Sequence, residues 1–280
     1  MKPLAPFPSK RRVRPVDAIW SIGASDIFTV HFALYIVLGF VAQLIDGALG
    51  QAYGVIVTTA LLATGSPPAV ASASTHAAEI VTTGLAGGSH IWHRNVDWGL
   101  FSRLVPGGVV GGFVGAYVLT QVPEDPVKLL ISIYLLAMAV LIARQIYTGG
   151  RERDHNMPTA PIGLAGGFFD AVGGGGWGSF VNSTLITRGE SARCSIGSAS
   201  LAEFFVTIAV STTFVLQLDL GGYVLVVLGL IMGGAVAAPL AGWISKTLPH
   251  GVLAAMVGLT VASLAVYNLI SVSSELFAAP

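Results

Sequence analysis

Long apolar stretches, separated by glycine-rich or polar segments, form the main pattern of this chain. Examples of the longest are residues 28–45, 129–143, 220–244 and 252–272. An α-helix crosses the roughly 30 Å hydrocarbon core of a bilayer with about 20 predominantly apolar residues. The pattern therefore predicts an all-α, polytopic membrane protein.

The composition agrees with this prediction. The 280 residues are 54% hydrophobic and only 10% charged, whereas soluble domains carry about 25% charged residues. The formal net charge is zero, and we expect no nucleic-acid partner. The single cysteine, Cys194, excludes an internal disulfide and a cysteine-based metal cluster. We expect neither a metal site nor a cofactor.

Two parts of the chain resemble each other. Residues 39–80 align without a gap onto residues 163–204, at a constant offset of 124. Ten of the 42 aligned positions are identical, and they include the carboxylate pairs Asp46/Asp170 and Glu79/Glu203. The alignment predicts that the chain consists of two pseudo-symmetric repeats.

Each repeat is predicted to contain five helical pieces: a long one, a short one and three more. The pieces are residues 27–48, 51–63, 67–91, 99–120 and 127–147, then 160–172, 176–187, 191–216, 220–246 and 250–272. The predicted organisation is a basic N-terminal tail with an interfacial helix at 1–26, a first transmembrane repeat at 27–147, a polar linker at 148–158 and a second repeat at 159–280.

The second piece of each repeat is too short to span a membrane comfortably, and it follows the loop "DGALGQAYG" or "DAVGGGGWG". Irregular backbone at membrane depth is tolerated only where protein buries it or a water-filled cavity solvates it. Matching short, glycine-interrupted segments in two halves are the best sequence indication of a transporter's binding site. We therefore expect both loops to line a central cavity.

The orientation of the repeats stays open. If each broken pair counts as one crossing, the Lys and Arg residues divide 10 against 4 between the two sides. If it counts as two crossings, they divide 6 against 8 and the repeats are inverted. The positive-inside rule favours the first arrangement, whereas inverted repeats are common in transporters.

The two loops could bind an anion without Lys or Arg. Glycine lets backbone N–H groups approach a ligand closely, and helices that begin near Tyr53 and Trp177 would point their positive dipole ends at it. We interpret Gly173–Gly176 as such a binding loop. A second set of glycines is instead interpreted as helix-packing residues: Gly107, Gly108, Gly111, Gly112 and Gly115.

Four carboxylates accompany the loops. Glu79 and Glu203 lie near the middle of the third helices, where an ionisable residue is costly and by default functional. Each could carry a proton, or it could fasten helices through a hydrogen bond. His76, one turn from Glu79, could relay a proton or make a structural hydrogen bond. With Asp46 and Asp170, which precede the loops, the glutamates could instead supply oxygens to a hard cation.

The order of these motifs resembles the sulfite exporter TauE/SafE family of membrane permeases. The matching segments are "GFVAQLIDGALGQAYGVIVTTALLATGSPPAVASAST" at 39–75, "HRNVDW" at 93–98 and "LAGGFFDAVGGGGWGSFVNSTLITRGESARCSIGSAS" at 164–200. The resemblance implies transport of small sulfur oxyanions or organosulfonates, such as sulfite or sulfoacetate. It also implies that the loop glycines and the hydroxyl groups of Ser74, Thr75 and Ser198 line the anion site.

The chain departs from the family pattern in two places. The first loop reads Gly50-Gln51-Ala52-Tyr53-Gly54 where glycines are usual. Asp46 and Asp170 stand where small residues are frequent. Two carboxylates near the cavity are unfavourable for a fully anionic substrate unless they are protonated or point away, so the substrate could differ from sulfite.

We predict a secondary transporter of the cytoplasmic (inner) membrane that moves a small, sulfur-containing anion and couples transport to protons. No ATPase or metalloprotease motif is present, and we expect no enzyme activity. A cation transporter or exchanger that uses the four carboxylates is the alternative. Transport direction and homo-oligomerisation stay open.

The predicted substrate-binding residues are Gly50, Gln51, Tyr53, Thr58, Ser74, Thr75, Gly174, Gly175, Gly176, Trp177, Asn182 and Ser198. Proton coupling is assigned to His76, Glu79 and Glu203. A gating or structural role is assigned to Asp46 and Asp170.

Overall fold

A computed structural model of the chain describes residues 30–49, 52–144, 158–188, 190–219 and 221–247, with isolated helical positions between 259 and 270. The described residues form helices and no strand. The longer helices are α3 (Val30–Leu49), α4 (Tyr53–Ala63), α5 (Pro68–Trp92), α6 (Trp98–Gln121), α7 (Glu124–Arg144), α8 (Thr159–Gly173), α10 (Ala192–Gln217) and α11 (Val224–Thr247). The shorter ones are the π-helix η2 (Gly178–Asn182), α9 (Ser183–Thr187) and the 3-10 helix η3 (Gly221–Tyr223).

The all-α prediction is confirmed, and the predicted helices agree with the observed ones within a few residues wherever both are described. Local sequence signals explain the boundaries. Pro67 and Pro68 start α5, and Asp97 starts α6 by accepting a hydrogen bond from the Leu100 N–H at 3.0 Å. The predicted tail at 1–26, most of the linker at 148–158 and most of the helix at 250–272 lie outside the described residues.

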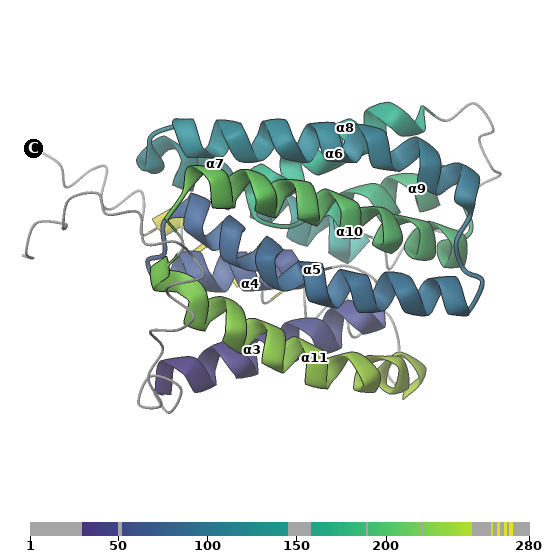
Figure 1. Cartoon of the computed structure of the whole chain (residues 1–280), viewed down its shortest axis with the longest axis horizontal. Coiled ribbons are helices and arrows are strands. Elements are labelled where there is room, and N and C mark those ends of the chain that lie inside the picture. The colour runs from purple at the N-terminus through teal and green to yellow at the C-terminus, as the bar shows by residue number, and fades with distance from the viewer. Residues whose placement is uncertain are drawn as a thin grey trace, which may run out of the picture.

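The helices lie side by side along the long axis of the molecule (Figure 1). The most extensive helix–helix contacts join α6 to α8 and α3 to α11, which form opposite edges in Figure 1. Between these pairs, α5 packs against α10, while α11 also contacts α5 and α6 also contacts α10. The first helix of each predicted repeat therefore packs against the fourth helix of the other repeat.

Glycines allow the close approach within both outer pairs. On α6, a Cβ at Gly107, Gly111 or Gly115 would collide with the backbone of α8. A Cβ at Gly108 or Gly112 would lie within 2.8 Å of side chains such as Trp177 and Val210. The prediction that these five glycines serve helix packing is confirmed. In the α3–α11 pair, Gly39 and Gly233 make the corresponding backbone contacts, with Leu230 and Ile36.

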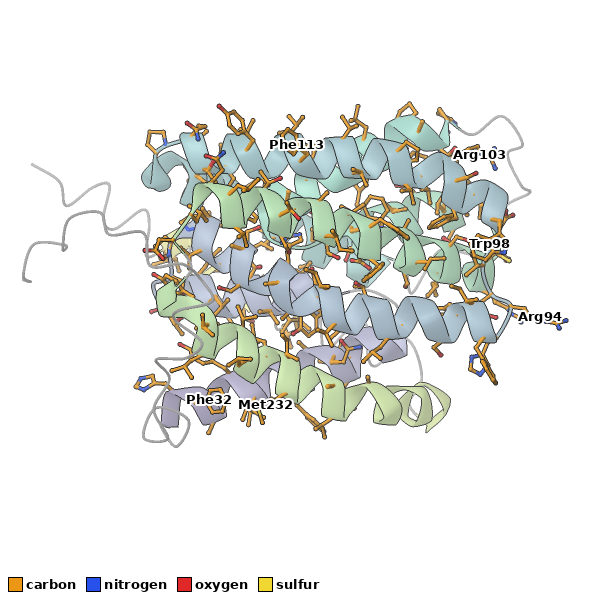
Figure 2. All side chains as sticks on the ribbon, in the orientation of Figure 1. Phe32, Arg94, Trp98, Arg103, Phe113 and Met232 are labelled. Atoms are coloured by element: carbon orange, nitrogen blue, oxygen red, sulfur yellow. The ribbon has the colours of Figure 1, made fainter. Side chains whose placement is uncertain are left out.

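The outer surface of the helices is apolar, unlike that of a soluble protein. Large apolar side chains are between 50% and 67% exposed along the outer helices: Leu34, Val37, Phe113, Leu216, Met232 and Val236. Figure 2 shows Phe113 at one outer edge and Met232 at the opposite one. Arg94 and Arg103 both lie toward the same end of the bundle, apart from each other (Figure 2), which leaves the apolar sides free of them.

Polar side chains are buried between the helices. Those with no more than 1% exposure include Thr58, Thr59, Ser72, Ser74, Thr75, His76, Asp170, Ser179, Ser195, Ser198 and Thr207. Among the described residues, three helices are long and apolar enough to cross a membrane: Trp98–Gln121, Arg193–Gln217 and Gly221–Ala238. An apolar exterior, with polar side chains buried within an otherwise apolar core, is the arrangement that a lipid environment favours. The protein is an integral membrane protein.

Candidate functional site

Two short helical segments face each other at the centre of the bundle. Helix α4 has 11 residues, so it spans only about 17 Å at 1.5 Å per residue, roughly half of the hydrocarbon core. Its counterpart consists of the π-helix η2 and the five-residue α9. The first turn of α4 meets the glycine loop that precedes η2 through backbone: a Cβ at Gly54 would lie 2.6 Å from the Gly175 Cα atom.

The tetraglycine is tightly packed. Gly174, Gly175 and Gly176 have φ angles of 71°, 139° and 130°, which side-chain-bearing residues rarely adopt. A Cβ at any of the four glycines would collide with a neighbour: Tyr134 at Gly173 and Gly176, Thr58 at Gly174, and the Gly54 backbone at Gly175. The loop therefore brings two backbones together, and the side of it that a Cβ would occupy is filled by protein instead of lining a cavity.

Asp170, at the end of α8, holds the start of the second short segment. Its Oδ1 atom accepts a hydrogen bond from the Trp177 N–H at 2.8 Å, and its backbone carbonyl accepts one from the Gly175 N–H at 2.9 Å. Its Oδ2 atom lies 3.1 Å from His76 Nε2 on α5. Asp170 is 1% exposed and His76 is fully buried.

The hydrogen bonds of His76 determine how many protons the His76–Asp170 pair carries. His76 Nδ1 lies 2.8 Å from the Ser72 carbonyl oxygen, which can only accept, so Nδ1 carries a hydrogen. The Ser72 hydroxyl donates elsewhere, to the Ala171 carbonyl at 2.6 Å. The contact between Nε2 and Oδ2 therefore needs one further proton, on either atom. An imidazolium–carboxylate pair and an imidazole–carboxylic acid pair both satisfy this geometry.

Each short helical segment follows a break in the helical structure, called here a chain break: the loop before Tyr53 is the first and the loop before Trp177 is the second. The first chain break has a contact that corresponds to the one between Asp170 and Trp177. Asp46 Oδ1 accepts a hydrogen bond from the Tyr53 N–H at 3.3 Å. Both residues lie 124 positions before Asp170 and Trp177, so the two hydrogen bonds are equivalent in the alignment of the halves. The Gly54 N–H donates to the carboxyl group of Glu79. The backbone N–H groups that were predicted to bind an anionic substrate thus bond to carboxylates of the protein itself. An external anion reaches these N–H groups only by displacing the carboxylates.

Hydroxyl groups link the two breaks to each other. Thr58 Oγ1 lies 2.9 Å from Thr75 Oγ1 and also donates to the Gly174 carbonyl. Tyr134 on α7 donates to the Gly175 carbonyl at 3.1 Å. The structure therefore brings the predicted residues Thr58, Thr75 and the glycine loop together. Tyr134 was not among the predicted site residues, because α7 has no counterpart within the aligned region and shows only an apolar pattern.

Other predicted site residues have structural partners. Ser198 Oγ accepts from the Asp97 N–H at 2.8 Å, at the start of α6, and Asn182 Oδ1 accepts from Ser195 at 3.3 Å. The Trp177 indole N–H donates to the Ala199 carbonyl at 3.0 Å. Ser74 is buried on α5. Gly50 and Gln51 lie outside the described residues.

Among the residues that the structure describes, five buried side-chain polar atoms have no hydrogen-bond partner: Gln43 Oε1, Tyr53 Oη, Glu79 Oε2, Ser179 Oγ and Ser211 Oγ. Most buried polar atoms in proteins are paired, so each exception needs an explanation. Two of these residues, Tyr53 and Glu79, are predicted site residues. Gln43 was not predicted, because its position aligns with Gly167 and carries no repeated signal.

The four carboxyl groups lie near one another. Glu79 interacts electrostatically with Asp170, Glu203 and Asp46. Within the part of the chain that the structure describes, however, no three His, Cys, Asp or Glu side chains converge in a way that could hold a metal ion. The arrangement therefore offers no chelating cluster there for a hard cation.

Comparison with known proteins assigns the chain to a class. The sequence model of the family described as "Sulfite exporter TauE/SafE" matches residues 35–268. The "Probable membrane transporter protein YtnM" of Bacillus subtilis (strain 168) is 39% identical over 232 residues, which cover 79% of this chain and 77% of that protein. No solved structure matches significantly.

Proposed function

The chain belongs to the sulfite exporter TauE/SafE family of membrane transporters, and we propose that it is a secondary transporter for a small sulfur oxyanion or organosulfonate. The observation that carries this proposal is the meeting of the two chain breaks, Gly54 against Gly175, among buried polar side chains. Such paired breaks are typical of transporter binding sites. The membrane is the cytoplasmic one, which the chain crosses several times.

The proposal includes a duplicated architecture. Asp46 and Asp170 bond to equivalent N–H groups, those of Tyr53 and Trp177. The outer helices pair in an equivalent way, α3 with α11 and α8 with α6. Both correspondences support two pseudo-symmetric repeats, with the substrate at the centre between them.

Transport is coupled to protons in this proposal. Glu79, Glu203 and the His76–Asp170 pair are the candidate proton carriers, because each places an ionisable group close to the chain breaks. Ionisable groups inside a membrane bundle commonly form proton relays. Among the described residues, the side chains that act electrostatically on Glu79 are acidic, so a proton would offset part of the charge of an incoming anion.

A ligand screen tests the proposed substrate class. The purified protein is heated in detergent with sulfite, sulfoacetate, thiosulfate or, as controls, sodium chloride and calcium chloride. A ligand that binds the folded protein at a hundred times its Kd stabilises it by about 2.7 kcal/mol. We expect a raised Tm with at least one sulfur anion. Stabilisation by Na⁺ or Ca²⁺ alone would instead support the cation transporter that the four carboxylates suggested.

A further inference from the structure

The surroundings of the two chain breaks differ in polarity, although their residues correspond at the offset of 124. In the second half, the Trp177 ring fills the space beside Gly108, Gly166 and Val206. Its indole N–H is paired with the Ala199 carbonyl. The surroundings of the Trp177 ring are apolar, whereas Ser179 Oγ and Ser211 Oγ elsewhere in this half have no hydrogen-bond partner.

The first half is polar at the same positions. Tyr53 takes the place of Trp177, Gln43 that of Gly167 and Thr82 that of Val206. All three surround Gly234 of α11: a Cβ there would lie 3.8 Å from the Gln43 Cβ and the Tyr53 Cε2, and 2.9 Å from the Thr82 Cγ2. Gln43, Tyr53 and Thr82 are each 3% exposed.

Three buried polar atoms of this side are unpaired: Gln43 Oε1, Tyr53 Oη and Glu79 Oε2. The residues come from three different helices, α3, α4 and α5. Glu79 is tied to the same place, because its carboxyl group accepts from the N–H of Gly54, the neighbour of Tyr53. Leaving several polar atoms unpaired in a buried site is costly, and a ligand that pairs with them removes that cost.

From this asymmetry we propose that Gln43, Tyr53 and Glu79 form the polar part of a one-sided substrate site, and that Glu79 takes up one proton with each bound anion. The inference rests on the proposed anion transport and assigns it to one half of the molecule. The Tyr53 hydroxyl donates to an anion oxygen, and so does the Gln43 side chain, whose amide N and O atoms can exchange places by rotation.

Acidic groups surround Glu79, so a proton on its carboxyl group reduces the repulsion of an incoming anion. The groups that act on it are Asp46 from α3, Tyr53 from α4, Asp170 from α8 and Glu203 from α10. His76 on its own helix is engaged with Asp170, and the described side chains of α11 include no titratable group. An ionised Glu79 would repel an anion, whereas a protonated Glu79 donates its O–H hydrogen to it. The proton comes from water and remains on the carboxyl group while the anion is bound.

Calorimetric titration tests this linkage. Sulfoacetate and thiosulfate are used because neither titrates near neutral pH, and the wild-type protein is compared with Glu79→Gln and with the matched variant Glu203→Gln. Titration in two buffers of different ionisation enthalpy counts the protons taken up. For the wild type we expect one proton per anion at high pH, so the affinity falls about tenfold per pH unit.

The Glu79→Gln and Glu203→Gln variants should differ in the proton uptake that accompanies anion binding. Glu79→Gln should bind the anion without proton uptake and with an affinity independent of pH, because the amide donates permanently. Glu203→Gln should still take up one proton per anion at high pH, because Glu79 is intact, although the loss of the Glu203 charge shifts the pH range over which the uptake begins. Tyr53→Phe should weaken binding about tenfold without changing the wild-type pH dependence, while Tyr117→Phe on the exposed surface should not weaken it. Thermal unfolding of each variant verifies that it is folded.

Results that contradict the one-sided site can be distinguished from a result that contradicts anion transport itself. Loss of proton uptake in Glu203→Gln but not in Glu79→Gln would overturn the one-sided site and leave anion transport intact. So would wild-type binding without proton uptake. If the wild-type protein binds none of the sulfur anions, the proposed function itself fails.

Discussion

The His76–Asp170 contact depends on a proton. His76 Nδ1 is committed to the Ser72 carbonyl, so a deprotonated pair would place a lone pair of Nε2 against Oδ2 at 3.1 Å. Removing this proton breaks a contact between α5 and the end of α8. Asp170 also holds the Trp177 N–H. One carboxyl group thus connects a proton-binding contact to the start of the second short segment.

Substitutions at Asp170 should distinguish its charge from its hydrogen bonds. Asp170→Ala leaves the Trp177 N–H and His76 without a buried acceptor and should lower the free energy of unfolding by about 2–4 kcal/mol. Asp170→Asn keeps an oxygen for Trp177 and an N–H group for Nε2, so it should cost less. Thermal or denaturant unfolding in detergent measures both changes.

The control for this prediction is an exposed residue with a similar bond. Asp219 Oδ1 accepts from the Gly221 N–H at 3.1 Å on the surface. Asp219→Ala should cost less than about 1 kcal/mol. Equal losses for Asp170→Ala and Asp219→Ala would show that the buried contacts of Asp170 contribute little to stability.

Part of the site was predictable from single residues. The duplicated carboxylates and the glycine run identify the chain breaks, because few physical reasons exist for either inside a membrane. The partner of each group was not predictable. Asp170 meets His76 across 94 positions, and Thr58 meets Gly174 across 116, so only the folded chain brings these residues together. The occupation of the Tyr53 and Trp177 N–H groups by Asp46 and Asp170 is likewise a result of tertiary structure.

At the scale of the helices, stripes of glycine determine which elements pair. Gly107, Gly111 and Gly115 occupy one face of α6 and let α8 approach until backbone touches backbone. In lipid, this close packing replaces the hydrophobic effect as the main source of helix association. The sequence predicts the stripe from its spacing, but it does not name the partner, since α8 is not the neighbour of α6 in the chain.

A pair of glycine substitutions tests the packing. Gly111→Ala would place its Cβ against the Leu164 carbonyl, so α6 and α8 must separate. We expect a loss of at least about 2 kcal/mol, measured as the free energy of unfolding in detergent or bicelles. Gly88→Ala is the control, because a Cβ there meets nothing within 4 Å. It should be neutral or stabilise the protein by up to about 1 kcal/mol.

If both glycine variants unfold at the wild-type midpoint, the bundle tolerates a wider spacing between α6 and α8 than the contacts indicate. A loss at Gly88 comparable with that at Gly111 would instead indicate a general intolerance of side chains at helical glycines. Only a loss confined to Gly111 supports the specific contact between α6 and α8.

At the scale of the whole molecule, the two predicted repeats are interlocked. α6 belongs to the first repeat but packs on α8 and α10 of the second, and α11 of the second packs on α3 and α5 of the first. The predicted boundaries of the repeats stay predictions, because the linker lies outside the described residues. Sequence similarity alone predicts the repeats but not this exchange, since it compares the halves without indicating which surfaces meet.

Severing the chain between Arg144 and Thr159 tests the interlocking. Co-expressed as two fragments, with an affinity tag on the first, the halves should purify together, because both outer helix pairs join one fragment to the other. The fragments should stay together in mild detergent, as judged by size-exclusion chromatography. Recovery of the tagged fragment alone, still folded by circular dichroism, would show that each half is self-sufficient.

The exchange of α6 and α11 also constrains how the transporter can change shape. A hinge between the two predicted repeats would have to separate both glycine-lined helix pairs, α6–α8 and α3–α11, at once. The interface between α5 and α10 can slide without separating either pair, and it lies beside the meeting point of Gly54 and Gly175. In the secondary transporter proposed above, alternating exposure of that point to the two sides of the membrane would therefore move rigid units that mix the predicted repeats, each built from three helices of one predicted repeat and one of the other.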